Sequence, residues 1–287
     1  MTAGLVAGTP AADYLALYLR LLDPAAKVLR VPADLCVPFW ERLADNRSLR
    51  VETVPPMRRT FPEPTGRLAF WRSTGIASAY TWTRVVHLEP EVLSYEDVML
   101  RTGLHPGPGP GPLVLAALSA HLGMSCSYVG IAASPGTVAD RGALDGPAFV
   151  SLWNEFHPGH RLRTVCADLT RDRLLAALPA GSERDLSSCD RRAEGWCGDC
   201  SSCFTAFYTA KAVGRPLGFR LSGAIFDDLY TRRYRRYLAS EFQDGDSDTL
   251  RCLAHLQMTY GLRFDRTLDV SSDARTARPT QPQQERI

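Results

Sequence analysis

The feature that most constrains the fold is a cluster of cysteines in the last third of the chain. The cysteines are separated by seven, two and two residues, and they are Cys189, Cys197, Cys200 and Cys203. A gap of two residues lets consecutive thiolates converge on one ion through a tight turn, and Gly198 gives that turn its backbone freedom. Four thiolates around one tetrahedral ion form a closed structural site of the kind that holds zinc. The spacing therefore predicts a zinc knuckle without an open position for substrate or water.

Other uses of these thiols stay open at the level of the sequence. Closely spaced cysteines also ligate iron–sulfur clusters, and unliganded thiols are a further alternative. A thioredoxin-like redox pair explains less, because such a pair needs no third or fourth cysteine. The remaining cysteines occur in apolar contexts, as expected of small buried side chains; they are Cys36, Cys126, Cys166 and Cys252.

Upstream of the cluster, short apolar runs alternate with helical patterns. Strands are expected at residues 27–31, 48–54, 67–71, 84–88, 126–132 and 161–167. Helices are expected at residues 11–22, 34–45 and 113–122, directly after the cysteines, and at 224–239 and 247–259. This alternation predicts an α/β fold with a mainly parallel sheet flanked by helices.

The same pattern suggests a division of the chain into three parts. Residues 1–185 are expected to form an α/β domain, and residues 186–262 are expected to form the zinc knuckle and a helical region. Residues 263–287 are polar and contain proline, so they have little to bury and are expected to be disordered.

The composition limits the class of protein. Hydrophobic residues make up 45% and charged residues 22% of the chain, as in ordinary globular proteins. The net charge of +2 is smaller than that of a dedicated nucleic-acid binder. The longest apolar runs are too short to span a bilayer, and no positively charged segment precedes the first of them. A cytoplasmic protein without a membrane partner is expected, and its cysteines are expected to be thiols or metal ligands rather than disulfides.

Residues 187–207 resemble the zinc-binding segments of two enzyme families. In the 7-cyano-7-deazaguanine synthases, a lone cysteine precedes a Cys-Gly-x-Cys-x-x-Cys run. The UDP-N-acetylmuramoyl-L-alanyl-L-glutamate epimerases carry Ser-Cys, then Trp-Cys-Gly-x-Cys-x-x-Cys-x-Phe. Ser188 and Cys189 match this second pattern, as does the run from Trp196 to Cys203, with Phe204 one place early. Both families belong to the PP-loop ATP pyrophosphatase superfamily.

That resemblance implies a PP-loop or Rossmann-like fold that binds ATP with Mg²⁺ at a strand–loop–helix and activates a substrate by adenylation. The superfamily's phosphate loop reads Ser-Gly-Gly-x-Asp-Ser, and residues 73–78, Ser-Thr-Gly-Ile-Ala-Ser, take its place after the expected strand. Backbone N–H groups and hydroxyls at a helix N-terminus bind phosphate oxygens. The resemblance thus implies phosphate contacts from Ser73, Thr74, Gly75 and Ser78.

The loop departs from the pattern at two positions. Thr74 stands where the pattern has glycine, so a Cβ occupies a place where the backbone would approach phosphate. Ala77 stands where the pattern has aspartate, so a carboxylate is missing. A strand-to-helix turn without a ligand is the alternative interpretation of these six residues.

Residues 133–156 take the place of a polar, substrate-facing loop in the epimerases, with Asn154, Glu155 and His157 as its polar candidates. A solvated helix face for Glu155 and a turn containing His157 and His160 are the alternatives. No catalytic role is implied for any of them.

Arginines and tyrosines alternate within residues 227–239. On a helix the tyrosines share one face, and the arginines form a surface that suits phosphate groups of a nucleotide-linked substrate or RNA. A solvated helix explains the same pattern. Its aspartates lie near the N-terminal end and its arginines near the C-terminal end, where the helix dipole favours each charge.

Three functions follow, in this order. The first is an ATP-dependent biosynthetic enzyme that activates a carboxyl or amide group of a small or nucleotide-linked substrate and carries a structural zinc ion. The second is a degenerate relative without ATP turnover, which binds a ligand or partner or works without adenylation. The third is a zinc-knuckle protein that binds nucleic acid. The sequence leaves a homo-oligomer open.

Overall fold

The computed structural model describes residues 9–45, 47–102, 111–132, 146–187, 189, 192, 195–215 and 217–220. The expected helices at 224–239 and 247–259, the arginine–tyrosine segment, the expected tail and Cys252 lie outside these residues. The described chain divides into two compact units. The first unit holds residues 9–73, 77–132 and 146–169, and the second holds residues 74–76 and the described residues after 169. The expected boundary between residues 185 and 186 stays a prediction.

The first unit contains a parallel sheet with the strand order β4-β3-β5-β6. Its strands are β3 (Leu68–Arg72), β4 (Glu91–Ser94), β5 (Cys126–Tyr128) and β6 (Arg161–Arg163). The chain places β4 on one side of β3 and β5 on the other, so the order of strands reverses between β3 and β5. Open α/β sheets bind ligands at the carboxyl ends of the strands that flank such a switch point.

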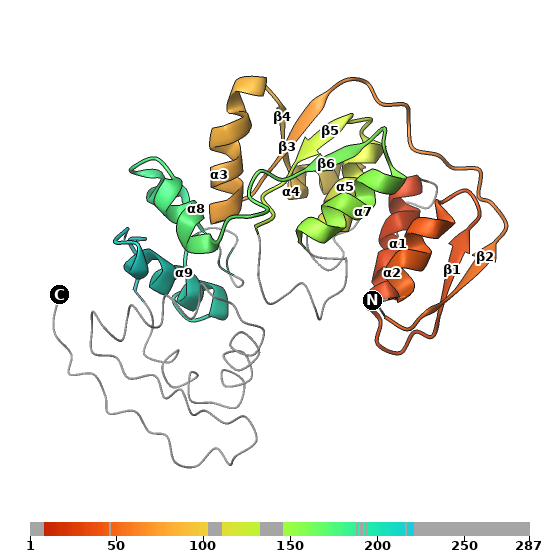
Figure 1. Ribbon diagram of the computed structural model, residues 1–287, viewed down its shortest axis with the longest axis horizontal. Helices are drawn as coiled ribbons and strands as arrows, with labels where there is room; N and C mark the ends of the chain where they lie inside the picture. Colours follow the sequence, from red (N-terminus) through yellow and green to blue (C-terminus); the bar gives the residue numbers. More distant parts are fainter. Residues whose placement is uncertain are drawn as a thin grey trace, which may run out of the picture. The chain divides into compact units, whose positions relative to one another are not determined.

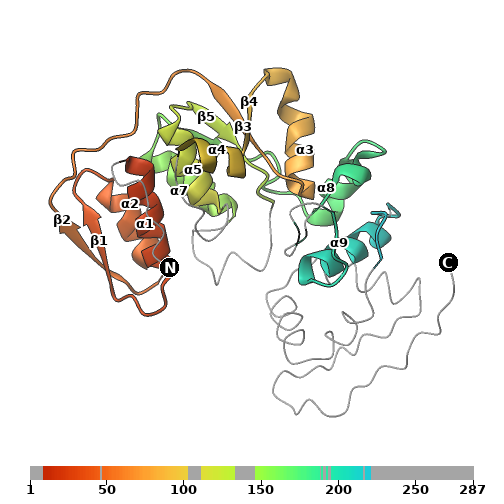
Figure 2. The ribbon, with the colours of Figure 1, turned by 180° about the vertical axis from the view of Figure 1, so that it is seen from behind.

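A second, smaller sheet precedes the first. Strands β1 (Val28–Pro32) and β2 (Arg50–Val54) pair in parallel and are joined by helix α2 (Val37–Asp45). Helix α1 (Pro10–Leu22) is capped at its N-terminus by Thr9, whose hydroxyl accepts a hydrogen bond from the N–H of Ala12 at 3.2 Å. Figures 1 and 2 show α1 and α2 between this small sheet and the rest of the first unit.

The other helices described in the first unit connect the strands of its larger sheet. They are α3 (Ile76–Val85), the short 3₁₀ helix η1 (Val86–Leu88), α4 (Tyr95–Thr102), α5 (Pro112–His121) and α7 (Pro147–Phe156). Helices α1 and α5 pack together, and α7 contacts α2, α5 and β6. None of the helices in the described part of the chain is long and apolar enough to cross a membrane.

An aromatic core holds the helices of the first unit together. Tyr14 of α1, Phe39 and Trp40 of α2 and Trp153 of α7 are each at most 2% exposed. The ring centroids of Tyr14 and Trp40 lie 5.1 Å apart, and those of Phe39 and Trp153 lie 5.7 Å apart in an edge-to-face arrangement. Large aromatic side chains contribute much apolar burial, so this core fixes how α1, α2 and α7 pack.

The second unit is helical where it is described. It contains α8 (Arg171–Ala177), the 3₁₀ helix η3 (Ser182–Asp185) and α9 (Ser201–Ala212). The guanidinium of Arg215, which follows α9, donates to the carbonyl oxygens of Leu175 and Leu178, each at 2.6 Å, and pairs with Glu183. A cation at carbonyls that end a helix is favourable, so Arg215 ties α8, η3 and α9 into one body.

The prediction of an α/β fold with parallel sheets flanked by helices is confirmed. The expected strand at 84–88 is wrong, because residues 76–85 form α3 and residues 86–88 form η1. Its β-branched run lacks an alternating buried face: Val85 is buried at the end of α3, whereas Val86 and Leu88 are exposed. The strand that follows these helices is β4, in which Leu93 is buried, whereas Val92 before it is exposed and Ser94 after it is half-buried.

Candidate metal centre

The structure brings the four clustered cysteines together in the second unit. The sulfur atoms of Cys189, Cys197, Cys200 and Cys203 all lie within 4.8 Å of one another, and those of Cys197 and Cys203 are 3.7 Å apart. Zinc–sulfur bonds of about 2.3 Å in a tetrahedron place sulfur atoms about 3.8 Å apart. The cluster is therefore of the right size to hold one four-coordinate metal ion such as zinc.

Local backbone conformation builds this cluster. Gly195 and Gly198 both have φ +70°, in the left-handed region that glycine adopts without strain. Cys203 lies in the first turn of α9, and its N–H donates to the sulfur of Cys200 at 3.4 Å. The N–H of Asp199 donates to the sulfur of Cys197 at 3.3 Å. Such donors favour thiolate over thiol and orient the sulfurs toward a shared ion.

Burial makes a cation necessary if all four groups are to be thiolates. Removal from water raises the pKa of the Cys203 thiol, and the neighbouring thiols of Cys200 and Cys197 raise it further. Burial likewise raises the pKa of Cys197. A bound cation reverses this effect, because metal ligation deprotonates a thiol outright. All of the cysteines in the described residues are free of disulfides.

Hydrogen bonds connect the segment before Cys189 to the predicted phosphate loop. The N–H of Ser187 donates to the carbonyl oxygen of Thr74 at 2.7 Å, and the Thr74 hydroxyl donates to the carbonyl oxygen of Ser187 at 2.5 Å. The Ser187 hydroxyl in turn donates to the carbonyl oxygen of Gly195. Ser187 therefore bridges the loop and the knuckle, although nothing in the sequence singled it out.

Residues 73–78, the predicted phosphate loop, lie between a strand and a helix, and their last three residues form the first turn of α3. Residues 73–78 follow β3 directly and lead into α3, at the carboxyl end of the strand beside the switch point. Ser78 is only 3% exposed, and its hydroxyl accepts from the N–H of Ser73 at 2.9 Å and donates to the carbonyl oxygen of Trp71 at 3.4 Å. The hydroxyls of Thr74 and Ser78 are thus used within the chain.

The loop after β5 covers the first turn of α3. A Cβ on Gly130 would lie 2.4 Å from the backbone nitrogen of Ser78, so only a glycine fits there. The backbone of Gly130 therefore occupies space next to an N–H that a phosphate-binding helix N-terminus would offer. The phosphate contacts implied for Ser73, Thr74, Gly75 and Ser78 stay predictions.

The polar candidates of α7 have their side chains engaged or exposed. The Asn154 amide donates to the carbonyl oxygen of Leu162 and accepts from its N–H, both at 2.8 Å. Glu155 is exposed, as the alternative interpretation expected. His157 and His160 form the expected turn, in which the N–H of His160 donates to the carbonyl oxygen of His157 at 3.0 Å.

His157 is also a core residue, which the sequence did not predict. It is 8% exposed, its Nε2 lies 2.7 Å from the Tyr14 hydroxyl, and its ring stacks on Trp153 with centroids 3.9 Å apart. Burial lowers the pKa of His157 to about 4. The expectation of buried cysteines outside the cluster holds for Cys126 and Cys166, whereas Cys36 is half-buried.

An aromatic stack flanks the cysteine cluster. The rings of Trp196 and Phe219 lie 4.5 Å apart and nearly parallel, at 8°. Trp196 precedes Cys197 directly, so the stack links the knuckle to the segment after α9. Trp196 belongs to the cysteine pattern of the sequence, whereas nothing in the sequence indicated that Phe219 is its partner.

Comparisons with protein-family models, with curated proteins and with solved structures find no significant match to this chain. Inferences about function thus rest on the sheet topology and on the geometry of the cysteine cluster.

Proposed function

We propose that Cys189, Cys197, Cys200 and Cys203 bind one structural zinc ion. The convergence of their sulfurs within 4.8 Å carries this proposal. An iron–sulfur cluster is larger than a single ion and holds its cysteine sulfurs farther apart, so the observed spacing favours zinc. Four protein ligands leave no open position, so the ion stabilises the fold and does not take part in chemistry.

The protein is, on this proposal, a relative of the PP-loop type that binds a phosphate-bearing or nucleotide-linked ligand without ATP turnover. The support comes from the loop at residues 73–78. It lies beside the switch point of the sheet, yet Thr74 and Ser78 use their hydroxyls within the chain. Ala77 provides no carboxylate. This combination keeps the location of a ligand site and lacks groups that adenylation needs.

Nucleotide binding and turnover test this assignment separately. Titration calorimetry with ATP and Mg²⁺ measures affinity, and ATP–pyrophosphate exchange with candidate carboxylates and amides measures adenylation. We expect no exchange for the wild-type chain. The double variant Thr74→Gly, Ala77→Asp restores the loop pattern, and we expect no gain in exchange, because the first turn of α3 stays packed against Gly130 and the Ser78 hydroxyl stays bonded to Ser73. Exchange activity in the wild-type protein contradicts the proposal.

The ATP-dependent enzyme is the second candidate. The observation in its favour is the strand–loop–helix itself, since β3, residues 73–78 and α3 follow one another at the switch point. Phosphate binding would then require the hydroxyls of Thr74 and Ser78 to exchange their present partners for phosphate oxygens. Substrate-dependent ATP–pyrophosphate exchange that Gly75→Val abolishes supports this candidate over the first.

The nucleic-acid binder rests on residues 227–239, which lie outside the described residues. It stays a prediction. Filter binding to RNA at increasing salt tests it, because phosphate contacts by arginines make affinity fall steeply with salt concentration. Absence of binding at low salt dismisses it.

A further inference from the structure

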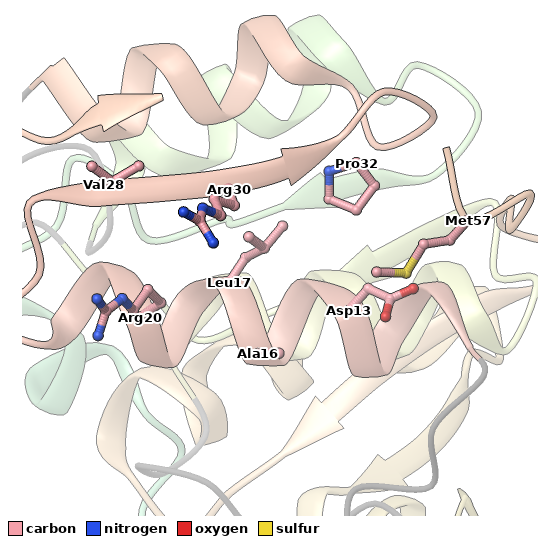
Figure 3. Close-up of a pocket in the computed structure, with 8 residues that line it drawn as sticks. All are labelled: Asp13, Ala16, Leu17, Arg20, Val28, Arg30, Pro32 and Met57. Atoms are coloured by element: carbon pink, nitrogen blue, oxygen red, sulfur yellow. The ribbon is translucent and has the colours of Figure 1, made fainter. Parts of the chain in front are cut away.

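Two pockets of the first unit have volumes typical of small-molecule sites, about 500 Å³ and about 510 Å³. The smaller one lies between α1 and β1, with Asp13 and Arg20 on the helix and Arg30 on the strand (Figure 3). Each of its charged side chains has a partner within the chain: Arg59 for Asp13, Asp23 for Arg20 and Glu52 for Arg30. Because its charged side chains are all paired within the chain, this pocket shows no preference for a charged ligand.

The larger pocket differs in its charges. It lies along β6 between the C-terminal end of α3 and helix α7, and its charged lining residues are Arg84 and Arg163, with His87 beside them. None of the described residues that line it is a carboxylate. Within the described part of the chain, neither guanidinium forms an ion pair with an acidic side chain. Two guanidinium groups at one pocket, without an acidic partner among the described residues, produce a local positive potential that attracts an anion.

Both arginines are attached to well-held parts of the fold. The guanidinium of Arg84 lies over the ring of Tyr80, 5.0 Å from its centroid, in a cation–π contact. Arg163 ends strand β6, and its carbonyl oxygen accepts from the N–H of Val129 at 2.9 Å. The Tyr80 contact limits the freedom that the Arg84 side chain loses when a ligand binds, and the Val129 hydrogen bond fixes the backbone from which Arg163 extends.

Most of the other described lining residues of the pocket are apolar, and two of its polar side chains are already hydrogen-bonded within the chain. Leu88 and Val165, which line it, are 40% and 37% exposed, so they offer apolar surface to a ligand. The Asn154 amide is occupied by the backbone of Leu162, and the Thr164 hydroxyl donates to the carbonyl oxygen of Ile131 at 2.6 Å. Arg84 and Arg163 are therefore the main groups that could bind a polar part of a ligand, and they lie beside the exposed apolar side chains of the same pocket.

We propose that this pocket binds a small organic anion, whose carboxylate or phosphate group is bound by Arg84 and Arg163 and whose apolar body lies on Leu88 and Val165. Guanidinium groups suit both kinds of oxyanion, because their N–H donors match paired oxygens. The pocket contains no residue of the loop at 73–78 and no cysteine of the knuckle. It is thus a second site, beyond the proposed function.

Calorimetry and thermal shift on the full chain test the proposal, with phenyl phosphate and benzoate as probes. We expect saturable binding of at least one probe, with benzyl alcohol and inorganic phosphate each binding at least tenfold more weakly. Benzyl alcohol lacks the charge, and inorganic phosphate lacks the apolar body. The stronger of the two probes identifies the oxyanion. Failure of both probes to bind overturns the proposal, as does equal affinity for inorganic phosphate.

Variants locate the binding. Arg84→Gln and Arg163→Gln are each expected to weaken the preferred probe by about tenfold, because a charge-assisted hydrogen bond contributes roughly that much. Arg161→Gln is the matched control, since Arg161 is exposed on the same strand and does not line the pocket. Gly75→Val in the loop is expected to leave the affinity unchanged, which separates this site from the proposed one. Equal losses in Arg161→Gln and Arg163→Gln contradict the proposal.

Discussion

At the scale of single residues, His157 shows how a polar group becomes part of an aromatic core. Its Nε2 lies 2.7 Å from the Tyr14 hydroxyl, and its ring stacks on Trp153. The hydrogen bond satisfies the neutral imidazole, whereas a charged imidazolium would be removed from water. The residue therefore stabilises the fold only while it is neutral.

This environment predicts a loss of stability in acid. The unfolded chain takes up the His157 proton near pH 6.5, whereas burial lowers the pKa in the folded protein to about 4. The unfolded state thus binds more protons between these values, and stability falls as the pH drops from about 6.5 to 4. The loss from this residue is about 3 kcal/mol when complete.

Urea unfolding at pH 7 and at pH 4.5 measures the effect. His157→Gln is expected to reduce the pH dependence of the free energy of unfolding by about 2.5 kcal/mol between these values. The exposed His87 provides the control variant, His87→Gln. Identical pH dependence in the wild-type and His157→Gln proteins contradicts the interpretation.

At the scale of elements, the outer edge of β6 is protected by side chains of α7. Strand β6 ends the four-stranded sheet, so the backbone of Leu162 lacks a neighbouring strand on that side among the described residues. The Asn154 amide takes the place of such a strand, with one donated and one accepted hydrogen bond. The indole N–H of Trp153 donates to the carbonyl oxygen of His160 at 2.6 Å. Covered edges do not invite pairing with other chains.

Asn154→Ala is expected to destabilise the protein by about 2 kcal/mol, because it leaves a backbone N–H and C=O of Leu162 without these partners. Asn154→Asp keeps the acceptor for the N–H but loses the donor, so an intermediate loss is expected. The neighbouring exposed residue supplies the control, and Glu155→Ala is expected to change stability by less than about 0.5 kcal/mol. Chemical denaturation measures all three. A loss in Asn154→Ala no larger than in Glu155→Ala contradicts the edge role.

The elements also show what the sequence could predict. Buried strands such as β3 and amphipathic helices such as α1 have local patterns, and both were predicted close to their bounds. Residues 84–88 have the β-branched composition of a strand, but the exposure of Val86 and Leu88 depends on tertiary packing that the local pattern does not contain. The cysteine spacing predicted that the four thiols converge, because a shared metal ion requires short and regular gaps between its ligands. The contact between Thr74 and Ser187 joins distant segments through the Thr74 hydroxyl and backbone groups of both residues, and no local sequence pattern indicates such a pairing.

At the scale of the whole molecule, the two compact units have different sources of stability. The first has an aromatic core that includes Trp40 and Trp153, both fully buried. The described part of the second has short helices, the Arg215 contacts and the cysteine cluster. Metal binding to such a site contributes directly to folding, since the site does not exist in the unfolded chain.

Chelation is therefore expected to loosen the second unit selectively. Hydrogen exchange of the full chain, with and without a strong zinc chelator, measures this by mass spectrometry. Amides of α9 (Ser201–Ala212) are expected to lose protection, whereas amides of α5 (Pro112–His121) keep theirs. Unchanged protection in α9 contradicts a stabilising role for the ion, and so does equal loss in both helices.

The binding of one zinc ion by four cysteine sulfurs can be measured by X-ray absorption spectroscopy combined with metal analysis of the purified protein. We expect one zinc per chain, with four sulfur neighbours at about 2.3 Å, and loss of that zinc in Cys200→Ser. Iron in place of zinc, a shell containing oxygen or nitrogen, or protein that is folded and free of metal would contradict it.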